Sequence, residues 1–170
     1  MKKKIVITGG LGYIGTELCK LYSGVSWHHE IIVIDKRFIS ERVNQIRNWN
    51  MEFIQGDILD KNIIKKYCED ADVVHHLAGV TDVPRTKSET SESQDKKIKE
   101  VGVKGTQNIL DVISNKCKII FPSTHVVFEG INEVKKDIRE DENTKPVLSY
   151  SSSKAINEEQ LKKSGKNFII

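Results

Sequence analysis

The sequence predicts an α/β fold: a doubly wound, mainly parallel sheet with helices on both faces. Three observations support this prediction. Short apolar runs alternate with helical segments along the chain. A glycine cluster, Gly9 to Gly15, follows the first apolar run, and the second apolar run ends in Asp35. Strands that alternate with helices require crossover connections, and these connections place the strands parallel.

The first strand is expected near 3–8, and the helix near 12–23 follows the glycines directly. Gly9 can turn the chain tightly, Gly12 leaves room for a pyrophosphate, and Gly15 allows the helix to pack against its strand. Free N–H groups at the helix N-terminus and the positive end of the helix dipole then face the anion. The spacing G-x-x-G-x-x-G, counted from Gly9, is one residue longer than the common dinucleotide motif.

The second strand is expected near 31–35. Its last residue, Asp35, lies 20 positions beyond Gly15. A carboxylate at that distance accepts hydrogen bonds from the adenosine ribose and repels a 2′-phosphate. We therefore expect NAD rather than NADP as the cofactor. Lys36 and Arg37 follow immediately and could weaken that preference, and a simple strand-end turn remains the alternative for Asp35.

The remaining elements follow from apolar periodicity and turn residues. A polar stretch, 81–97, is expected to be a mobile loop that leads into one long helix. No internal repeat is visible. The expected strands lie near 51–55, 72–77, 118–122 and 167–170, and the expected helices near 38–48, 60–68, 94–115 and 150–164.

Composition indicates one soluble cytoplasmic domain. The chain is 38% hydrophobic and 30% charged, with a net charge of +3 and scattered Lys and Arg, so we expect no nucleic-acid partner. No apolar run approaches the roughly 18 residues of a membrane span, and no secretory segment precedes the first strand. Cys19, Cys68 and Cys117 lack metal-ligand spacing and are expected to be reduced thiols.

We expect no metal site. His28-His29 and His75-His76 are adjacent pairs. Neighbouring residues on a strand point to opposite faces and cannot easily chelate one ion.

A second motif, Tyr150-Ser-Ser-Ser-Lys154, places a phenol and an ammonium four residues apart on one helix face. A hydride leaves a carbinol only if the hydroxyl proton also leaves, which requires a nearby general base. Tyrosine normally titrates near ~10, and a neighbouring ammonium favours the phenolate and lowers that pKa. The pair predicts catalysis, although the same spacing also occurs on ordinary surface helices.

With these motifs in order, the chain resembles the extended branch of the short-chain dehydrogenase/reductase family. The resemblance is to the NAD-dependent epimerase/dehydratase group, which acts largely on nucleotide sugars. It runs from residue 3 to the last residue. Besides the motifs above, it rests on Gly56-Asp57-Ile58, His76-Leu77-Ala78-Gly79, Gly105-Thr106-Gln107-Asn108-Ile109-Leu110, Phe121-Pro122-Ser123-Thr124 and Pro146.

The resemblance implies a Rossmann-type fold that binds NAD, a nucleotide-sugar substrate, and a possible homodimer through the helices near 94–115 and 150–164. It implies that Thr124 orients the substrate oxygen and that Lys154 also bonds the nicotinamide ribose. The implied catalytic residues are Thr124, Tyr150 and Lys154. The implied cofactor contacts are Gly9, Gly12, Tyr13, Ile14, Gly15, Asp35, Lys36, Asp57, Ile58, Leu77, Ala78, Gly79, Tyr150 and Lys154.

The chain departs from the family pattern in two places. Gly102 stands where the family usually has an Asn, so its side-chain hydrogen bond is lost. Family members also continue for well over a hundred residues beyond the strand expected at 167–170. We therefore expect residues 1–170 to form the NAD-binding domain without the C-terminal substrate domain, as a truncated form or fragment that is inactive alone.

The reaction subtype is indicated by the residues after Thr124. Family dehydratases place Asp-Glu there, whereas this chain has His125 and Val126. Valine transfers no proton, so 4,6-dehydration is disfavoured and epimerisation by reversible hydride transfer is expected. Val127-Phe128-Glu129-Gly130 resembles a segment of deoxysugar 4-keto reductases, which is the first alternative. A non-catalytic dinucleotide-binding module is the second.

Overall fold

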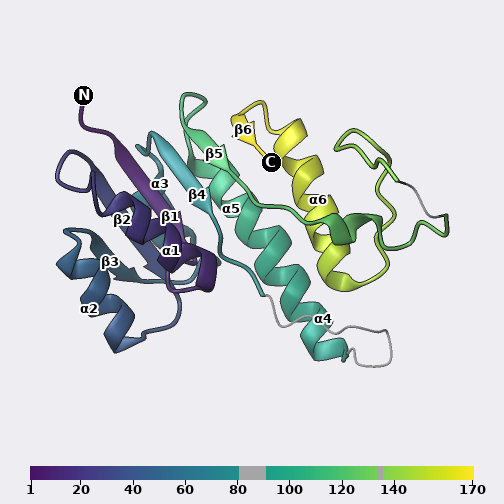
Figure 1. Cartoon of the computed structure of the whole chain (residues 1–170), viewed down its shortest axis with the longest axis horizontal. Helices are drawn as coiled ribbons and strands as arrows, with labels where there is room; N and C mark the ends of the chain where they lie inside the picture. Colours follow the sequence, from purple (N-terminus) through teal and green to yellow (C-terminus); the bar gives the residue numbers. More distant parts are fainter. Residues whose placement is uncertain (81–90, 134–135) are drawn as a thin grey trace.

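The computed structural model describes residues 1–80, 91–133 and 136–170. Six parallel strands form one sheet in the order β3-β2-β1-β4-β5-β6 (Figure 1), which confirms the predicted Rossmann-type fold. The strand order reverses between β1 and β4, where such sheets bind ligands. The strands are β1 Lys4–Thr8, β2 Glu30–Asp35, β3 Glu52–Gln55, β4 Val73–His76, β5 Lys118–Ile120 and β6 Asn167–Ile169.

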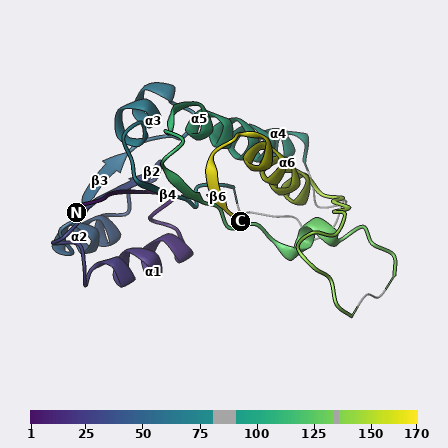
Figure 2. The same cartoon turned by 90° about the horizontal axis from the view of Figure 1, so that it is seen from above.

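Helices cover both faces of the sheet. Figure 2 shows α1 and α2 on one face and α3, α4, α5 and α6 on the other. No helix among the described residues is long and apolar enough to cross a membrane. The α-helices are α1 Tyr13–Tyr22, α2 Ser40–Asn48, α3 Lys61–Cys68, α4 Glu92–Lys99, α5 Gly105–Val112 and α6 Ser149–Lys163. Two further elements are the π-helix η2, Glu100–Lys104, and the 3-10 helix η3, His125–Phe128.

Two buried apolar clusters lie on opposite faces of the sheet. Successive strand residues point to opposite faces, so Ile5 and Ile7 of β1 pack in one cluster and Val6 in the other. Cys19, Cys68 and Cys117 are buried and unbridged, as predicted. Burial raises the pKa of the Cys19 thiol to about 12, so this thiol stays protonated at neutral pH.

The structure corrects the prediction for the polar stretch 81–97. Residues 81–90 lie outside the described residues, but 92–97 are helical: α4 begins at Glu92, two residues before the predicted start near 94. Ser91 caps the helix, because its hydroxyl oxygen accepts from the Gln94 N–H at 3.3 Å. Ile98 is buried and fixes the face that α4 turns inward.

The single long helix predicted near 94–115 is also corrected. It is divided by the π-helix η2, and α5 ends at Val112 because Ile113 is extended. Gly102 lies within η2 beside α6. A Cβ added at Gly102 would stand 3.3 Å from Ser153 Oγ, so the missing side chain allows η2 to lie close to α6.

A buried network of hydrogen bonds joins β1, β4, α5 and η2. Thr106 Oγ1 donates to the Gly102 carbonyl at 2.7 Å, so it can only accept from His76 Nε2, which lies 3.0 Å away. His76 Nδ1 is then free to accept from Thr8 Oγ1, at 2.9 Å. Thr8 Oγ1 in turn lies 3.3 Å from the Ala78 N–H. This hydrogen-bond network requires that the His76 imidazole be neutral, and burial lowers the pKa of His76 to about 3.

Acid should therefore destabilise the fold through His76. Its pKa is lower in the folded than in the unfolded chain, so its contribution is present above pH ~6.5 and is lost as pH falls toward 3. Between pH 7 and pH 5 the free energy of unfolding should fall by about 2 kcal/mol from this residue alone. Denaturant unfolding at both pH values, on the native chain and His76→Asn, measures it.

The exposed residue His28 provides the control. His28→Asn should keep the native pH dependence, whereas His76→Asn should flatten it. Equal slopes in the native chain and His76→Asn would contradict the prediction.

Candidate functional site

The glycine turn lies where β1 ends. Gly9 has φ +71°, in the left-handed region, as the predicted tight turn requires. Its N–H donates to the Ile34 carbonyl at 2.7 Å. A Cβ at Gly9 would stand 2.6 Å from the backbone nitrogen of Ala78, so only glycine allows the turn to lie between β2 and the loop after β4.

Two glycines differ from the sequence interpretation. Gly15 packs on the turn rather than on its strand, because a Cβ there would stand 2.5 Å from the Gly9 carbonyl oxygen. Gly10 received no role, yet a Cβ at Gly10 would collide with Val33 Cγ1 on β2. The signal was present in the sequence, since Gly10-x-Gly12-x-x-Gly15 has the common dinucleotide-motif spacing.

The N-terminus of α1 opens onto a cavity. Its N-cap, Gly12, provides no side-chain acceptor for the first N–H groups, and none of the first-turn residues is acidic. A Cβ at Gly12 would meet only the Gly9 carbonyl oxygen at 3.1 Å and Arg37 Nη2 at 3.9 Å. Free N–H groups and the positive end of the helix dipole therefore face space suited to an anion.

The carboxyl end of β2 carries paired charges. Asp35 is 6% exposed and accepts from the backbone N–H groups of Leu11 and Arg37, both at 2.9 Å. Arg37 Nε lies 3.3 Å from Asp35 Oδ1. Lys36 Nζ lies 2.7 Å from Asp57 Oδ2. Burial would raise the pKa of Asp57, but hydrogen bonds from Lys36 and the Leu59 N–H hold it below its usual range.

One cavity of about 550 Å³ brings the predicted cofactor residues together, a volume within the range of small-molecule sites. It is lined by Gly9, Gly12, Tyr13, Ile14, Gly15, Asp35, Lys36, Asp57, Ile58, Leu77, Ala78, Gly79, Tyr150 and Lys154. The structure adds residues to which the sequence interpretation gave no role at the cofactor, among them Lys97 and Val101. These two come from α4 and η2, and no local motif marks them.

Lys154 extends across the end of β5. Its Nζ donates to the Pro122 carbonyl at 2.8 Å and lies 4.2 Å from the Phe121 ring centroid. Burial lowers the pKa of Lys154 to about 8, against the opposing charge of Glu158. A fraction of the ammonium is therefore deprotonated just above neutral pH.

Tyr150 does not show the lowered pKa that the sequence predicts. Lys154 Nζ lies 5.9 Å from the Tyr150 ring centroid, and burial raises the pKa of Tyr150. The reason is geometric: the ammonium is directed to the Pro122 carbonyl rather than to the phenol. In this arrangement desolvation outweighs the attraction between the two side chains.

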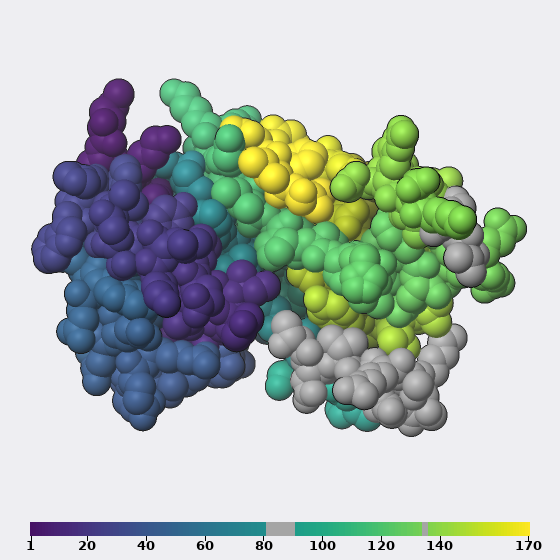
Figure 3. Space-filling model, in the orientation of Figure 1, coloured from purple at the N-terminus to yellow at the C-terminus, as the bar shows by residue number. Residues whose placement is uncertain are grey.

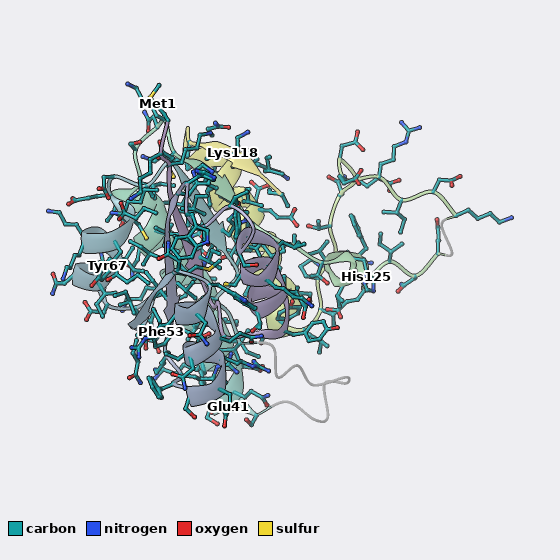
Figure 4. All side chains as sticks on the ribbon, turned by 60° about the vertical axis from the view of Figure 1, so that its left-hand side comes forward. Met1, Glu41, Phe53, Tyr67, Lys118 and His125 are labelled. Carbon is teal, nitrogen blue, oxygen red and sulfur yellow. The ribbon has the colours of Figure 1, made fainter. Side chains whose placement is uncertain are left out.

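Thr124 lies at the same end of the sheet but does not line the cavity. Its Oγ1 accepts from the Val126 N–H at 3.3 Å and caps η3. Its neighbour Ser123 lines the cavity instead and donates to Glu158 Oε1. His125 is exposed on η3, in the part of the chain that extends away from the sheet (Figure 4).

Comparison with known proteins decides the family. The model of the 3-beta hydroxysteroid dehydrogenase/isomerase family matches residues 6–169. The chain belongs to this family, and with it to the extended short-chain dehydrogenase/reductases that include the NAD-dependent epimerases and dehydratases.

Three similar proteins illustrate this relationship. The chain is 32% identical to a dTDP-D-glucose 4,6-dehydratase of Dictyostelium discoideum over 99% of its own length and 42% of the relative's. A UDP-glucuronic acid 4-epimerase from Bacillus cereus, solved with UDP-glucuronic acid and NAD, is 25% identical with a TM-score of 0.77, covering 100% of this chain and 55% of that one. A UDP-N-acetylglucosamine 4-epimerase from Methanobrevibacter ruminantium is 26% identical with a TM-score of 0.76, covering 99% and 54%. The chain thus spans about half the length of these relatives.

Replacing Gly12 tests whether the N-terminus of α1 receives a phosphate. In Gly12→Val the branched side chain would fill the space in front of the free N–H groups, and NAD binding should be lost. The fold should largely survive, because the Cβ meets no backbone atom closer than 3.1 Å. Calorimetry with NAD and circular dichroism measure the two effects.

Gly24→Val is the matched control, because nothing lies within 4 Å of a Cβ at that position. It should bind NAD as the native chain does. Normal NAD binding by a folded Gly12→Val would show that this turn is not the phosphate site.

Proposed function

We propose that this chain binds NAD in the 550 Å³ cavity and forms the cofactor half of a nucleotide-sugar epimerase-type enzyme. The observation that supports this most is the meeting of the two sequence motifs. The glycine turn and Asp35 line the same cavity as Tyr150 and Lys154, more than a hundred residues later. A dinucleotide and an acid–base pair in one cavity are what alcohol–ketone redox chemistry requires.

The cavity residues fit a dinucleotide. Gly12 leaves the helix N-terminus open to a pyrophosphate. The carboxylate of Asp35, held by two backbone N–H groups, is oriented for ribose hydroxyls. Lys154 would hold the nicotinamide ribose at the other end. When bound, NAD accepts a hydride from a sugar carbon and returns it.

Tyr150 would accept the proton that leaves the sugar hydroxyl. Because burial raises the pKa of Tyr150, the phenolate needs a cation nearby, and Lys154 is the candidate. Its Nζ would have to turn from the Pro122 carbonyl toward the phenol and the ribose. Thr124 would bond the same substrate oxygen after leaving its position as the cap of η3.

Epimerisation is favoured over dehydration by His125 and Val126. Dehydration needs a second acid–base pair to remove water, and the valine cannot supply one. His125 is exposed on η3 and does not line the cavity. An epimerase needs only one reversible hydride transfer, which Tyr150 and Lys154 suffice to support.

The first alternative is a reductase that transfers its hydride in one direction. The segment Val127-Phe128-Glu129-Gly130 supports it, as does the match to a hydroxysteroid dehydrogenase family model. Turnover of a keto substrate with NADH, without epimerisation of a nucleotide sugar, would select this alternative. NAD binding without either reaction would select a non-catalytic module.

Asp35 should make NAD the preferred cofactor. Its carboxylate would repel a 2′-phosphate, so calorimetry on this chain should show tighter binding of NAD than of NADP. Arg37, which lies 3.3 Å from Asp35, is the group that opposes this preference. Arg37→Ala should therefore widen the difference between the two cofactors, and equal or tighter NADP binding by the native chain would overturn the assignment.

Catalysis is tested in a longer form that also carries the part equivalent to the second half of the relatives. There, Tyr150→Phe should lower turnover by about 10² or more while NAD remains bound. Lys154→Met should weaken both NAD binding and turnover, and Thr124→Val should mainly reduce turnover. Tyr67→Phe, outside the cavity, is the control.

The 170-residue chain alone should show no epimerase turnover. Steady-state assays compare the two forms with a UDP-sugar. Full turnover by the short chain would refute the need for a second half, and an active Tyr150→Phe would refute the role of the phenol.

A further inference from the structure

We propose that Glu129 is a positioning residue that fixes the first turn of α6, and with it Tyr150, to the segment that begins at Thr124. Glu129 follows η3 directly, and Tyr150 is the second residue of α6. The proposal rests on the proposed function only in treating Tyr150 as the proton acceptor. The contact itself is a property of this chain.

One oxygen of Glu129 receives three donors from the start of α6. Oε1 accepts from the backbone N–H groups of Val147, at 2.7 Å, and Leu148, at 2.6 Å. It also accepts from the hydroxyl of Ser151, a residue that is fully buried. These three donors lie on both sides of Tyr150 in the sequence.

Glu129 reinforces the start of α6. The N-cap residue Leu148 has no side-chain oxygen for the first N–H groups of the helix, which usually receive a hydrogen bond from Ser, Thr, Asp or Asn at that position. The Leu148 N–H also donates to the Ser151 hydroxyl oxygen at 3.2 Å, so the carboxylate and the Ser151 hydroxyl hold this turn together. A negative charge at this position also interacts favourably with the helix dipole.

The backbone on either side of Glu129 is fixed to the same segment. The Gly130 N–H donates to the Lys145 carbonyl, and the Lys145 N–H donates to the Val127 carbonyl, both at 2.8 Å. A Cβ at Gly130 would stand 2.5 Å from the Lys145 carbonyl oxygen, so the two backbone segments are in close contact. Figure 3 shows the described residues between β5 and α6, in green and lime, as a lobe at one end of the molecule. Glu129 belongs to this segment and joins it to the start of α6.

The charge of Glu129 is maintained at neutral pH. Burial alone would raise its pKa, but the hydrogen bonds from Ser151, Leu148 and Val147 lower it below the usual range. Charge-assisted hydrogen bonds are roughly twice as strong as neutral ones, so a neutral side chain at 129 would hold the helix start more weakly. The first turn of α6 would then open, and water would reach the Tyr150 phenol.

The experiment follows the phenol directly. The native chain, Glu129→Ala and Glu129→Gln are labelled at the tyrosine ring carbon Cζ and titrated by NMR, with Tyr150→Phe assigning the signal. Burial raises the pKa of Tyr150 in the native chain, so opening the helix start should lower it toward the ordinary value of 10.0. Glu129→Ala should show the larger decrease and Glu129→Gln a smaller one.

Several comparisons separate positioning from a general loss of stability. Tyr13, Tyr22 and Tyr67 should titrate as in the native chain, and Glu133→Ala, an exposed glutamate of the same lobe, should leave Tyr150 unchanged. An unchanged Tyr150 in both Glu129 variants would overturn the proposal. If Glu129→Ala does not fold, Glu129→Gln decides alone.

Turnover measured in the longer form, which also carries the part equivalent to the second half of the relatives, tests the role of Glu129 independently. There, Glu129→Gln should lower kcat about tenfold, which corresponds to about 1.4 kcal/mol of barrier, while calorimetry shows the same affinity for NAD. If Tyr150→Phe proves fully active, the proposed function fails, yet the Tyr150 titration still decides the role of Glu129. If the pKa of Tyr150 and the turnover are both unchanged in Glu129→Gln, the positioning role of Glu129 is rejected. The proposed function is not affected by that result.

Discussion

The close approach of the glycine turn to the sheet is the constraint on which the cavity depends. Gly9 lies against the backbone of Ala78, Gly10 against Val33, and Gly15 against Gly9 itself. No side chain, even a methyl group, fits at these three contacts, so the turn stays flat against the ends of β2 and β4. This arrangement directs the N-terminus of α1 into the cavity and fixes where the loop after β4 passes.

Charged groups at the cavity are held by partners that orient them. Asp35 is fixed by the Leu11 N–H, Lys36 by Asp57, and Lys154 by the Pro122 carbonyl. Exposed ion pairs such as Lys36 with Asp57 contribute little to stability, typically ~0–1 kcal/mol. These contacts instead orient the side chains, because each one holds its side chain at the cavity wall. A ligand that binds there must compete with the protein partner of that side chain.

The sequence predicted the sheet and its helices well because apolar periodicity reports burial directly. It also identified the cavity-lining residues that belong to local motifs, since glycines and chain order mark them. It could not show that Ser123 rather than Thr124 lines the cavity, because neighbouring residues with similar side chains differ only in orientation. Nor could it find the contact of Glu129 with the start of α6, since this contact joins residues distant in sequence.

The π-helix η2 allows one continuous helical segment to pack against two different neighbours. α4 contacts α6, whereas α5 contacts mainly α3 and touches α6 to a smaller extent. A π turn holds one residue more than an α turn, and each α-helical residue advances the face by about 100°. If residues 100–104 were regularly α-helical, the extra residue would therefore rotate the apolar face of α5 by roughly a quarter turn relative to α4. The π turn absorbs this residue, so deleting one residue from 100–104 should restore a regular α-helix and be tolerated better than a deletion in an ordinary helix of equal exposure.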